Sequence, residues 1–389
     1  MPTSVLISGA GLAGPALAYW LAHHGFEPAV VEAAPALRTG GSAVDYRGPV
    51  HLGLLTRMGI LDQLREVQTH GTAMRFVDEH GRPTMQMPAG FAGGELEVRR
   101  GDLSRILAAA SGDRTEWIFG DRVAALSELP DRVEVTFAGG SQRSFDLVIG
   151  ADGVHSGVRR LAFGAESAYV RHLGYYLGGW AVPGCTGEGA GLNVPGKLAS
   201  VGDGQAFIAF SSPAELSYDR RDPEAQKQII RAQFAGLGWE VPRILAALDT
   251  AGDLYFDQIC RVDITPWSTG RIALIGDAAC GATLGGMGNG TALIAAYVLA
   301  GELATAGGDH RAAFARYERR LAGFARRAQK GGDTAGRFLA PRTASGLRLR
   351  NWLHNQNLII RLTMRIATER ATRIELPDYD LSAASAPRR

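Results

Sequence analysis

Three glycines near the N-terminus have the spacing of a phosphate-binding turn. Gly9, Gly11 and Gly14 form G-x-G-x-x-G between an apolar stretch at residues 5–8 and a segment rich in Ala and Leu. In a strand-turn-helix unit the first glycine permits the turn, the second lets the backbone approach a pyrophosphate, and the third lets helix and strand pack closely. The free N–H groups and positive dipole end of the helix favour an anion. These residues predict a bound phosphate.

An acidic residue follows at the distance that a dinucleotide site requires. A second apolar stretch, residues 28–31, ends in Glu32, 18 positions after Gly14. A carboxylate at this position accepts hydrogen bonds from the hydroxyls of an adenosine ribose, and it disfavours a 2′-phosphate because two negative groups repel. The chain holds 51 glycines, so the strand-helix-strand context supports the prediction more than the glycines alone. A β-α-β unit that binds nothing is the alternative.

Two later apolar stretches end in pairs of Asp and Gly. Residues 145–150 lead into Asp152-Gly153, and residues 271–275 lead into Gly276-Asp277. We expect the first stretch to lie parallel beside the opening strand. A Gly-rich loop at residues 280–290 then precedes an apolar helix at residues 291–304.

Arg99 and Arg100 precede the next predicted helix, and in an extended chain neighbouring side chains point to opposite sides. Asp102 is the expected N-cap of the helix that follows.

The remaining pattern predicts the elements that position these residues. We expect a helix at residues 50–67, a β-hairpin at 74–87, and a largely antiparallel region at 168–264 that includes a helix at 223–237. Residues 187–191 contain G-x-G-A-G but are expected to form a loop, and residues 310–373 are expected to be helical.

Composition excludes several classes of function. The net charge of +2 gives no field that favours nucleic acid or a membrane surface. Three cysteines without metal-ligand spacing predict no metal site and a reducing, cytoplasmic location. No apolar run reaches the 18 residues or so of a membrane span. A monomer or homodimer is expected.

Together these segments resemble the class A flavin-dependent monooxygenases with the para-hydroxybenzoate hydroxylase-like fold, and among them the tetracycline-hydroxylase branch. The match covers roughly residues 1–160 and 265–330. Its motifs are G-x-G-x-x-G with Glu32, Arg100 in an Arg-x-Asp-Leu setting, Asp152-Gly153, and Gly276-Asp277. The chain departs from the family at Cys280, where a His is usual, and in the following loop, which lacks the customary prolines.

The resemblance implies an α/β fold with a Rossmann-like FAD-binding domain of the GR2 type. A mainly antiparallel substrate domain is inserted into it, and helices follow at the C-terminus. The FAD-binding domain is expected to combine residues 1–73, 96–167 and 265–335, and the substrate domain residues 74–95 and 168–264. Residues 336–376 are expected to form the C-terminal helices, and residues 377–389 a frayed tail.

The resemblance also implies the cofactors and their site. It places Arg100 near the phosphates, which a guanidinium bonds bidentately, and Arg99, on the opposite side of the chain, is expected in a surface ion pair. FAD is the expected resident cofactor, and NADPH or NADH the transient reductant. FAD contacts are expected at Gly9, Gly11, Leu12, Ala13, Gly14, Glu32, Ala33, Arg38, Arg47, Arg100, Val123, Asp152, Gly153, Gly276, Asp277, Gly286, Gly288, Asn289 and Gly290. A capping or surface role is equally open for Arg47, and a plain turn role for Asp152.

Catalysis is expected where a helix N-terminus faces the pyrimidine edge of the flavin. The backbone of Gly288 and Asn289 would stabilise the reduced anion there, and Arg47 would contact a substrate or nicotinamide oxygen. Aromatic side chains of the inserted domain are the candidates for the substrate pocket, with plain core packing as the alternative: Tyr176, Trp180, Phe207 and Phe210.

The implied activity is hydroxylation of an aromatic or polyketide-like small molecule by O2 through a flavin hydroperoxide. The alternatives are an oxidase, a reductase or a cyclase-like enzyme without oxygen transfer, and a flavoprotein that only sequesters a ligand. A flavin-dependent halogenase is disfavoured because its W-x-W-x-I-P segment is absent.

Overall fold

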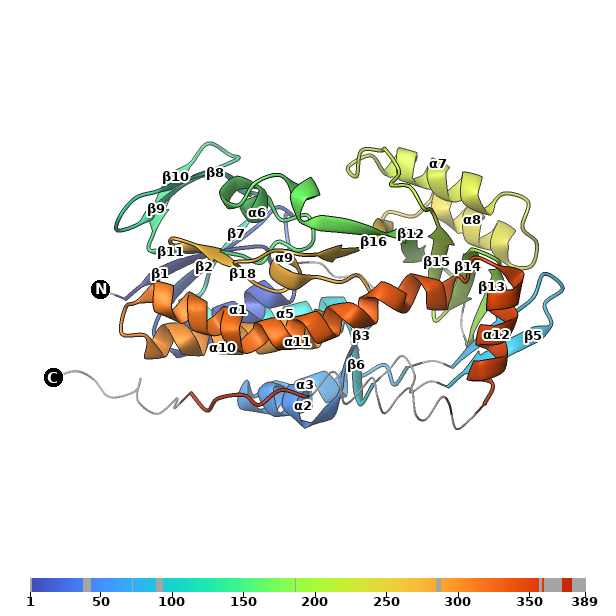
Figure 1. Cartoon of the computed structure of the whole chain (residues 1–389), viewed down its shortest axis with the longest axis horizontal. Coiled ribbons are helices and arrows are strands. Elements are labelled where there is room, and N and C mark those ends of the chain that lie inside the picture. Colours follow the sequence, from blue (N-terminus) through green and yellow to red (C-terminus); the bar gives the residue numbers. More distant parts are fainter. Residues whose placement is uncertain are drawn as a thin grey trace.

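The protein has two sheet-containing halves that lie side by side along its long axis (Figure 1). The computed structural model describes residues 2–37, 43–71, 73–88, 94–185, 187–284, 288–356, 359 and 373–379. One long helix, α11 (His310–Leu339), runs past both halves.

The first half is built on a six-stranded sheet in the order β17-β18-β11-β1-β2-β7. Its strands are β1 (Ser4–Ser8), β2 (Glu27–Glu32), β7 (Glu116–Phe119), β11 (Leu147–Gly150), β17 (Ser268–Thr269) and β18 (Ile272–Leu274). Both β2 and β11 pair parallel with β1, and β18 pairs parallel with β11. The predicted parallel pairing of the opening strand with residues 145–150 is confirmed, and the three motifs leave the sheet at one edge.

The second half is a seven-stranded sheet in the order β16-β12-β15-β14-β13-β4-β5. Its strands are β4 (Met74–Val77), β5 (Pro83–Met87), β12 (Val170–Ala181), β13 (Gly189–Val194), β14 (Lys197–Gly202), β15 (Gln205–Ser211) and β16 (Tyr255–Val262). All neighbours are antiparallel except β13 and β4. The predicted hairpin is confirmed as β4 and β5. Two helices, α7 (Pro223–Phe234) and α8 (Val241–Asp249), pack on one face of this sheet.

Helices and two small sheets complete the first half and its connections. The small sheets are β10-β9-β8, made of β8 (Val123–Glu128), β9 (Val133–Phe137) and β10 (Gln142–Phe145), and the pair β3 (Ala43–Tyr46) and β6 (Leu96–Arg99). The other helices are α1 (Ala13–His23), α2 (Gly48–Arg57), α3 (Leu61–Glu66), α5 (Arg100–Ala110), α6 (Gly157–Ala162), α9 (Asp277–Cys280), α10 (Gly288–Thr305) and α12 (Ala344–His354). The largest hydrophobic core packs α1 and α10 against the six-stranded sheet.

Three expectations from the sequence differ from the structure. The helix expected at residues 50–67 is divided into α2 and α3, because Gly59 adopts a φ of +70° that ends a helix. The helix after β6 begins at Arg100, so Asp102 lies in its first turn and pairs with Arg105 instead of capping it. α8 follows the predicted helix at 223–237 and was not expected.

The glycine-rich residues 187–191 also differ from the expected loop, because Gly189 begins strand β13. A Cβ on Gly191 would lie 2.8 Å from the Cβ of Ser200 on β14. These glycines therefore permit close packing within the sheet.

The chain after α12 returns to α10. Tyr379 is 5% exposed, and its hydroxyl donates to Glu302 Oε1 over 2.8 Å. Glu302 is itself buried and accepts from Arg316 and Arg320. The Tyr297 hydroxyl donates to the carbonyl of Pro377 over 2.8 Å. Residues 377–379 are thus packed on the helices, unlike the frayed tail expected there.

Among the described residues, no helix combines the length and apolar character needed to cross a membrane. In the same part of the chain, no group of three or more His, Cys, Asp and Glu side chains is placed to hold a metal ion.

Substitution of Gly301 tests the packing of this returning segment. A Cβ at Gly301 would lie 2.2 Å from Cδ2 of the Tyr379 ring, so Gly301→Ala must displace the ring from α10. We expect a loss of about 1–3 kcal/mol in the free energy of unfolding, measured by urea denaturation. Gly53→Ala is the control, because a Cβ at Gly53 in α2 meets nothing within 4 Å. Equal stability of the two variants would contradict the packing.

Candidate active site

A cavity of about 460 Å³ opens at the edge where β1, β11 and β18 end. Backbone hydrogen bonds tie the strand ends together: Ala151 N–H donates to Ser8 over 2.8 Å, and Ile275 N–H donates to Gly150 over 2.9 Å. Side chains from the glycine-rich turn, the Asp152 loop and the start of α10 line one continuous space. Its volume lies within the usual range for small-molecule and cofactor sites.

The glycines allow three chain segments to meet at this cavity. A Cβ on Gly14 would lie 2.0 Å from the carbonyl oxygen of Gly9, and a Cβ on Gly9 would lie 2.6 Å from the carbonyl oxygen of Ala151. Gly276 packs against Ala13, where a Cβ would come within 3.1 Å. The motifs that are far apart in sequence are therefore in direct contact, and side chains at Gly9 or Gly14 would separate them.

Gly11 has a different environment from its two neighbours. It lines the cavity, and a Cβ there would meet no protein atom within 4 Å. The first turn of α1 has no side-chain cap, so its backbone N–H groups are available to an anion. This open cradle with uncapped donors fits the pyrophosphate of a dinucleotide.

Glu32 links the end of β2 to the turn. Its Oε2 accepts from Ala10 N–H over 2.7 Å, and its Oε1 accepts from Ala34 N–H over 3.0 Å. The carboxylate lines the cavity while it holds the turn. Each oxygen keeps a further lone pair, which suits the ribose contact that the sequence predicts.

Arg100 and Asp277 both line the cavity. Arg100 is the first residue of α5, and Asp277 is the first residue of α9. The Asp277 side chain is accessible from the cavity, but protein atoms surround it closely. This enclosure raises the pKa of its carboxyl, and the charge of Arg100 opposes the shift. Arg99 points away and pairs with Asp203 on the surface at 3.0 Å, as predicted.

Asp152 braces its own loop. Its carboxylate accepts from the Ser156 hydroxyl and, over 3.1 Å, from Val158 N–H. Burial raises its pKa, and these hydrogen bonds oppose the shift. The turn role that the sequence left open for Asp152 therefore has a structural basis, although the residue also lines the cavity.

Thirteen of the residues expected to bind cofactor line this one cavity. They are Gly9, Gly11, Leu12, Ala13, Glu32, Ala33, Arg100, Val123, Asp152, Gly153, Asp277, Gly288 and Asn289. Gly14, Gly276 and Gly290 lie behind the lining in packed positions. Arg47 is 9% exposed and pairs with Asp45 at 2.6 Å. Arg38 and Gly286 fall outside the described residues.

The structure does not bring the four candidate substrate aromatics together. Tyr176, Trp180 and Phe210 are buried between the seven-stranded sheet and the helices α7 and α8. The Trp180 indole donates to the carbonyl of Ile244 on α8 over 3.1 Å. Phe207 packs on the opposite face of the sheet. Alternation along β15 separates Phe207 from Phe210. The three buried rings pack in the core, and Tyr176 also lines a second cavity of about 190 Å³.

Several cavity residues were not expected from the sequence. His155, Gly157 and Arg160 follow Asp152-Gly153 closely, so their position beside that motif was a usable signal. Arg221 comes from the loop before α7, and no local pattern marks it. It reaches the cavity only because the second half of the molecule lies against the first.

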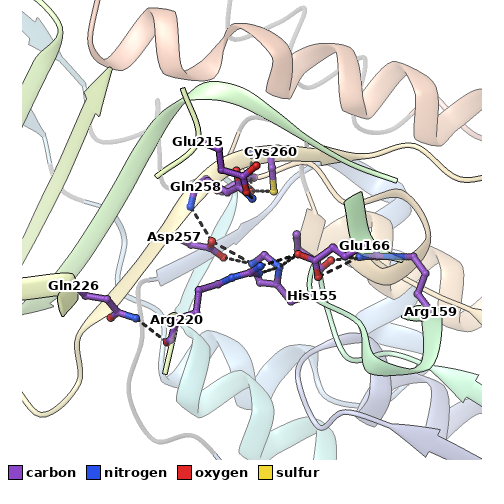
Figure 2. Close-up of polar contacts among 11 residues, drawn as sticks. His155, Arg159, Glu166, Glu215, Arg220, Gln226, Asp257, Gln258 and Cys260 are labelled. Atoms are coloured by element: carbon purple, nitrogen blue, oxygen red, sulfur yellow. Dashed lines mark hydrogen bonds and ion pairs between the residues drawn. The ribbon is translucent and has the colours of Figure 1, made fainter. Parts of the chain in front are cut away.

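His155 joins the two halves through a polar network (Figure 2). Its Nε2 lies 2.9 Å from Oδ2 of Asp257 on β16, and its Nδ1 lies 3.0 Å from Oε1 of Glu166. Arg220 contacts the same ring and donates to Glu166 over 2.8 Å. Burial opposes a charge on His155, but the hydrogen bonds with Asp257 and Glu166 outweigh it and raise the pKa to about 9. The ring is therefore charged at neutral pH.

Comparison with known proteins identifies the family of this chain and its cofactor. Residues 2–168 match the family model of an FAD binding domain. A protein named flavin-dependent monooxygenase from Legionella longbeachae is 37% identical over 342 residues, which cover 84% of this chain and 87% of that protein. The chain belongs to the flavin-dependent monooxygenases. FAD is its cofactor.

Solved structures share the whole architecture of this monooxygenase. The tetracycline destructase Tet(51) superimposes with a TM-score of 0.85 at 32% identity, covering 97% of this chain and 100% of that one. The tetracycline destructase Tet(55) gives a TM-score of 0.83 at 35% identity, covering 97% and 99%. The likeness extends over both halves, and the expected family and fold class are confirmed.

The charge on His155 predicts a pH dependence of stability in this monooxygenase. Because the pKa is raised from about 6.5 to about 9, the stabilisation is complete below about pH 6.5 and is lost as the pH rises through about 9. The free energy of unfolding of the wild type, relative to His155→Gln, should fall by about 1.4 kcal/mol per pH unit across this window. Urea denaturation between pH 6 and pH 10 measures it.

His80→Gln is the control for this titration, because His80 is exposed in the turn between β4 and β5. Its difference from the wild type should stay constant over the same range. A constant difference for His155→Gln as well would contradict the charged network.

Proposed function

We propose that this monooxygenase uses NADH or NADPH to hydroxylate an aromatic or polyketide-like small molecule with one atom of O2. The observation that supports the proposal is the single cavity that joins the glycine-rich turn, Arg100, Asp277 and the first turn of α10. When bound, FAD supplies the redox chemistry that activates O2, and the protein supplies position, charge and exclusion of water.

Each part of the cavity has a proposed task. The uncapped first turn of α1 binds the pyrophosphate, Glu32 orients the adenosine ribose, and Asp277 accepts from a ribityl hydroxyl. The first-turn N–H groups of α10, at Gly288 and Asn289, stabilise negative charge on the reduced pyrimidine ring. Arg47 is buried next to His51, whose ring lies against Gly290 in this turn, and Arg47 is proposed to orient the reacting molecules.

The rim of the cavity supports a transient nicotinamide cofactor. Arg122, Arg160 and Arg221 line it in addition to Arg100, and charged His155 lies among them. Guanidinium groups bind phosphate oxygens, so these arginines favour a second phosphate-bearing molecule, although Glu32, Asp121, Asp152 and Asp277 line the same cavity.

The substrate class follows from chemistry and from the relatives. The solved neighbours named tetracycline destructases indicate fused-ring polyketides as the first compounds to test. An electron-rich ring is the expected acceptor because the oxygen that a reduced flavin activates reacts as an electrophile.

The decisive experiment traces the oxygen atoms of O2 into the product. Purified protein is incubated with FAD, NADPH or NADH, 18O2 and a panel of tetracyclines and simpler phenols. We expect substrate-stimulated oxidation of the nicotinamide and a product heavier by one 18O atom, measured by mass spectrometry. Stimulated oxidation that releases only hydrogen peroxide would contradict oxygen transfer and favour an oxidase.

Two adjacent arginines give a matched test of the phosphate site. Arg100→Gln removes a charge that lines the cavity, whereas Arg99→Gln removes one paired with Asp203 on the surface. Loss of charge-assisted hydrogen bonds worth about 1.5–3 kcal/mol should weaken FAD binding at least tenfold in Arg100→Gln. Arg99→Gln should bind FAD like the wild type. Flavin fluorescence titration measures both, and equal affinities would contradict the role of Arg100.

A further inference from the structure

His51 is a fully enclosed histidine between two segments at the reactive end of the cavity. It lies in α2, and its side chain has no solvent exposure. On one side its Nδ1 accepts from the backbone N–H of Arg47 over 3.3 Å. On the other side its ring lies against Gly290 in the first turn of α10.

The hydrogen bond determines the protonation of the ring. Because Nδ1 accepts a hydrogen bond from Arg47 N–H, the proton of the neutral imidazole is on Nε2. Burial lowers the pKa of His51 to about 4, so the ring is neutral at physiological pH. Neutrality suits its place, since a positive charge there would oppose the positive end of the α10 dipole.

The contact with Gly290 leaves no space for a side chain. A Cβ at Gly290 would lie 2.2 Å from both Cε1 and Nε2 of His51. The Nε2–H group that faces this turn is buried and has no hydrogen-bond partner among the described residues. An unpaired buried donor is destabilising, so core packing alone does not explain a histidine at this position.

The turn that His51 contacts also forms part of the cavity. Gly288, Asn289 and Ala292 line it, and Gly290 lies among them in the same turn. The position of His51 therefore sets how far this turn can approach the segment that contains Arg47.

We infer that His51 is a positioning residue that acts through α10. As a neutral spacer between the Arg47 backbone and Gly290, it holds the first-turn N–H groups of α10 in the orientation that stabilises the reduced flavin. The inference rests on the proposed role of this turn, and its packing component is testable without cofactor.

A double-mutant cycle separates the ring contact from other effects. The variants are Gly290→Ala, His51→Ala and the double variant, with Gly53→Ala in α2 as the control because a Cβ there meets nothing. We expect Gly290→Ala to weaken FAD binding about tenfold, equivalent to 1.4 kcal/mol, and to lower the melting temperature of the apoprotein. In the His51→Ala background the added methyl group should have little effect on either quantity.

The flavin midpoint potential distinguishes positioning from simple core packing. With FAD bound, His51→Ala should shift the potential to more negative values by about 30 mV, which is a tenfold change for a two-electron couple. Gly53→Ala should leave it unchanged. An unchanged potential in His51→Ala, or equal damage by Gly290→Ala in both backgrounds, would overturn the inference. If the wild type bound no FAD, the proposed function would fail, whereas the apoprotein melting temperatures would still test the contact.

Discussion

The close approach of three backbone segments is the constraint on which the cofactor cavity depends. Gly14 lies against the carbonyl of Gly9, Gly9 lies against Ala151, and Gly276 lies against Ala13. No side chain separates these segments, so α1 is held directly over the ends of β1, β11 and β18. The same packing leaves the first turn of α1 uncapped and Gly11 open to the cavity, which is the arrangement that a pyrophosphate needs.

Contacts between the two halves bring further charged side chains to the cavity. His155 comes from the loop after β11, but its partner Asp257 is on the seven-stranded sheet, and Arg221 reaches the cavity from the loop before α7. The long helix α11 spans both halves (Figure 1). The inserted sheet is thus joined to the first half beside the cavity through a few charged groups.

The sequence was most informative at positions where one residue type meets a definite physical requirement. Glycine at positions 9, 11 and 14, an acid at the end of β2, and Arg100 in place of Arg99 follow from sterics, hydrogen bonding and side-chain alternation. The structure brings these residues to one cavity, with Gly14 packed behind its lining. The sequence was least informative where the role of a residue depends on the distant segments that pack against it. Tyr176, Trp180 and Phe210 became core because α7 and α8 cover one face of the sheet, and α8 itself was not predicted. His51 had no local signal because its partner Gly290 is distant in sequence.

A crystal structure of the protein with FAD is the most direct test of this account. We predict the pyrophosphate at the first turn of α1, the adenosine ribose at Glu32, and the flavin ring beside the first turn of α10 at Gly288 and Asn289. A flavin bound elsewhere, or one whose ring lies away from α10, would contradict the account.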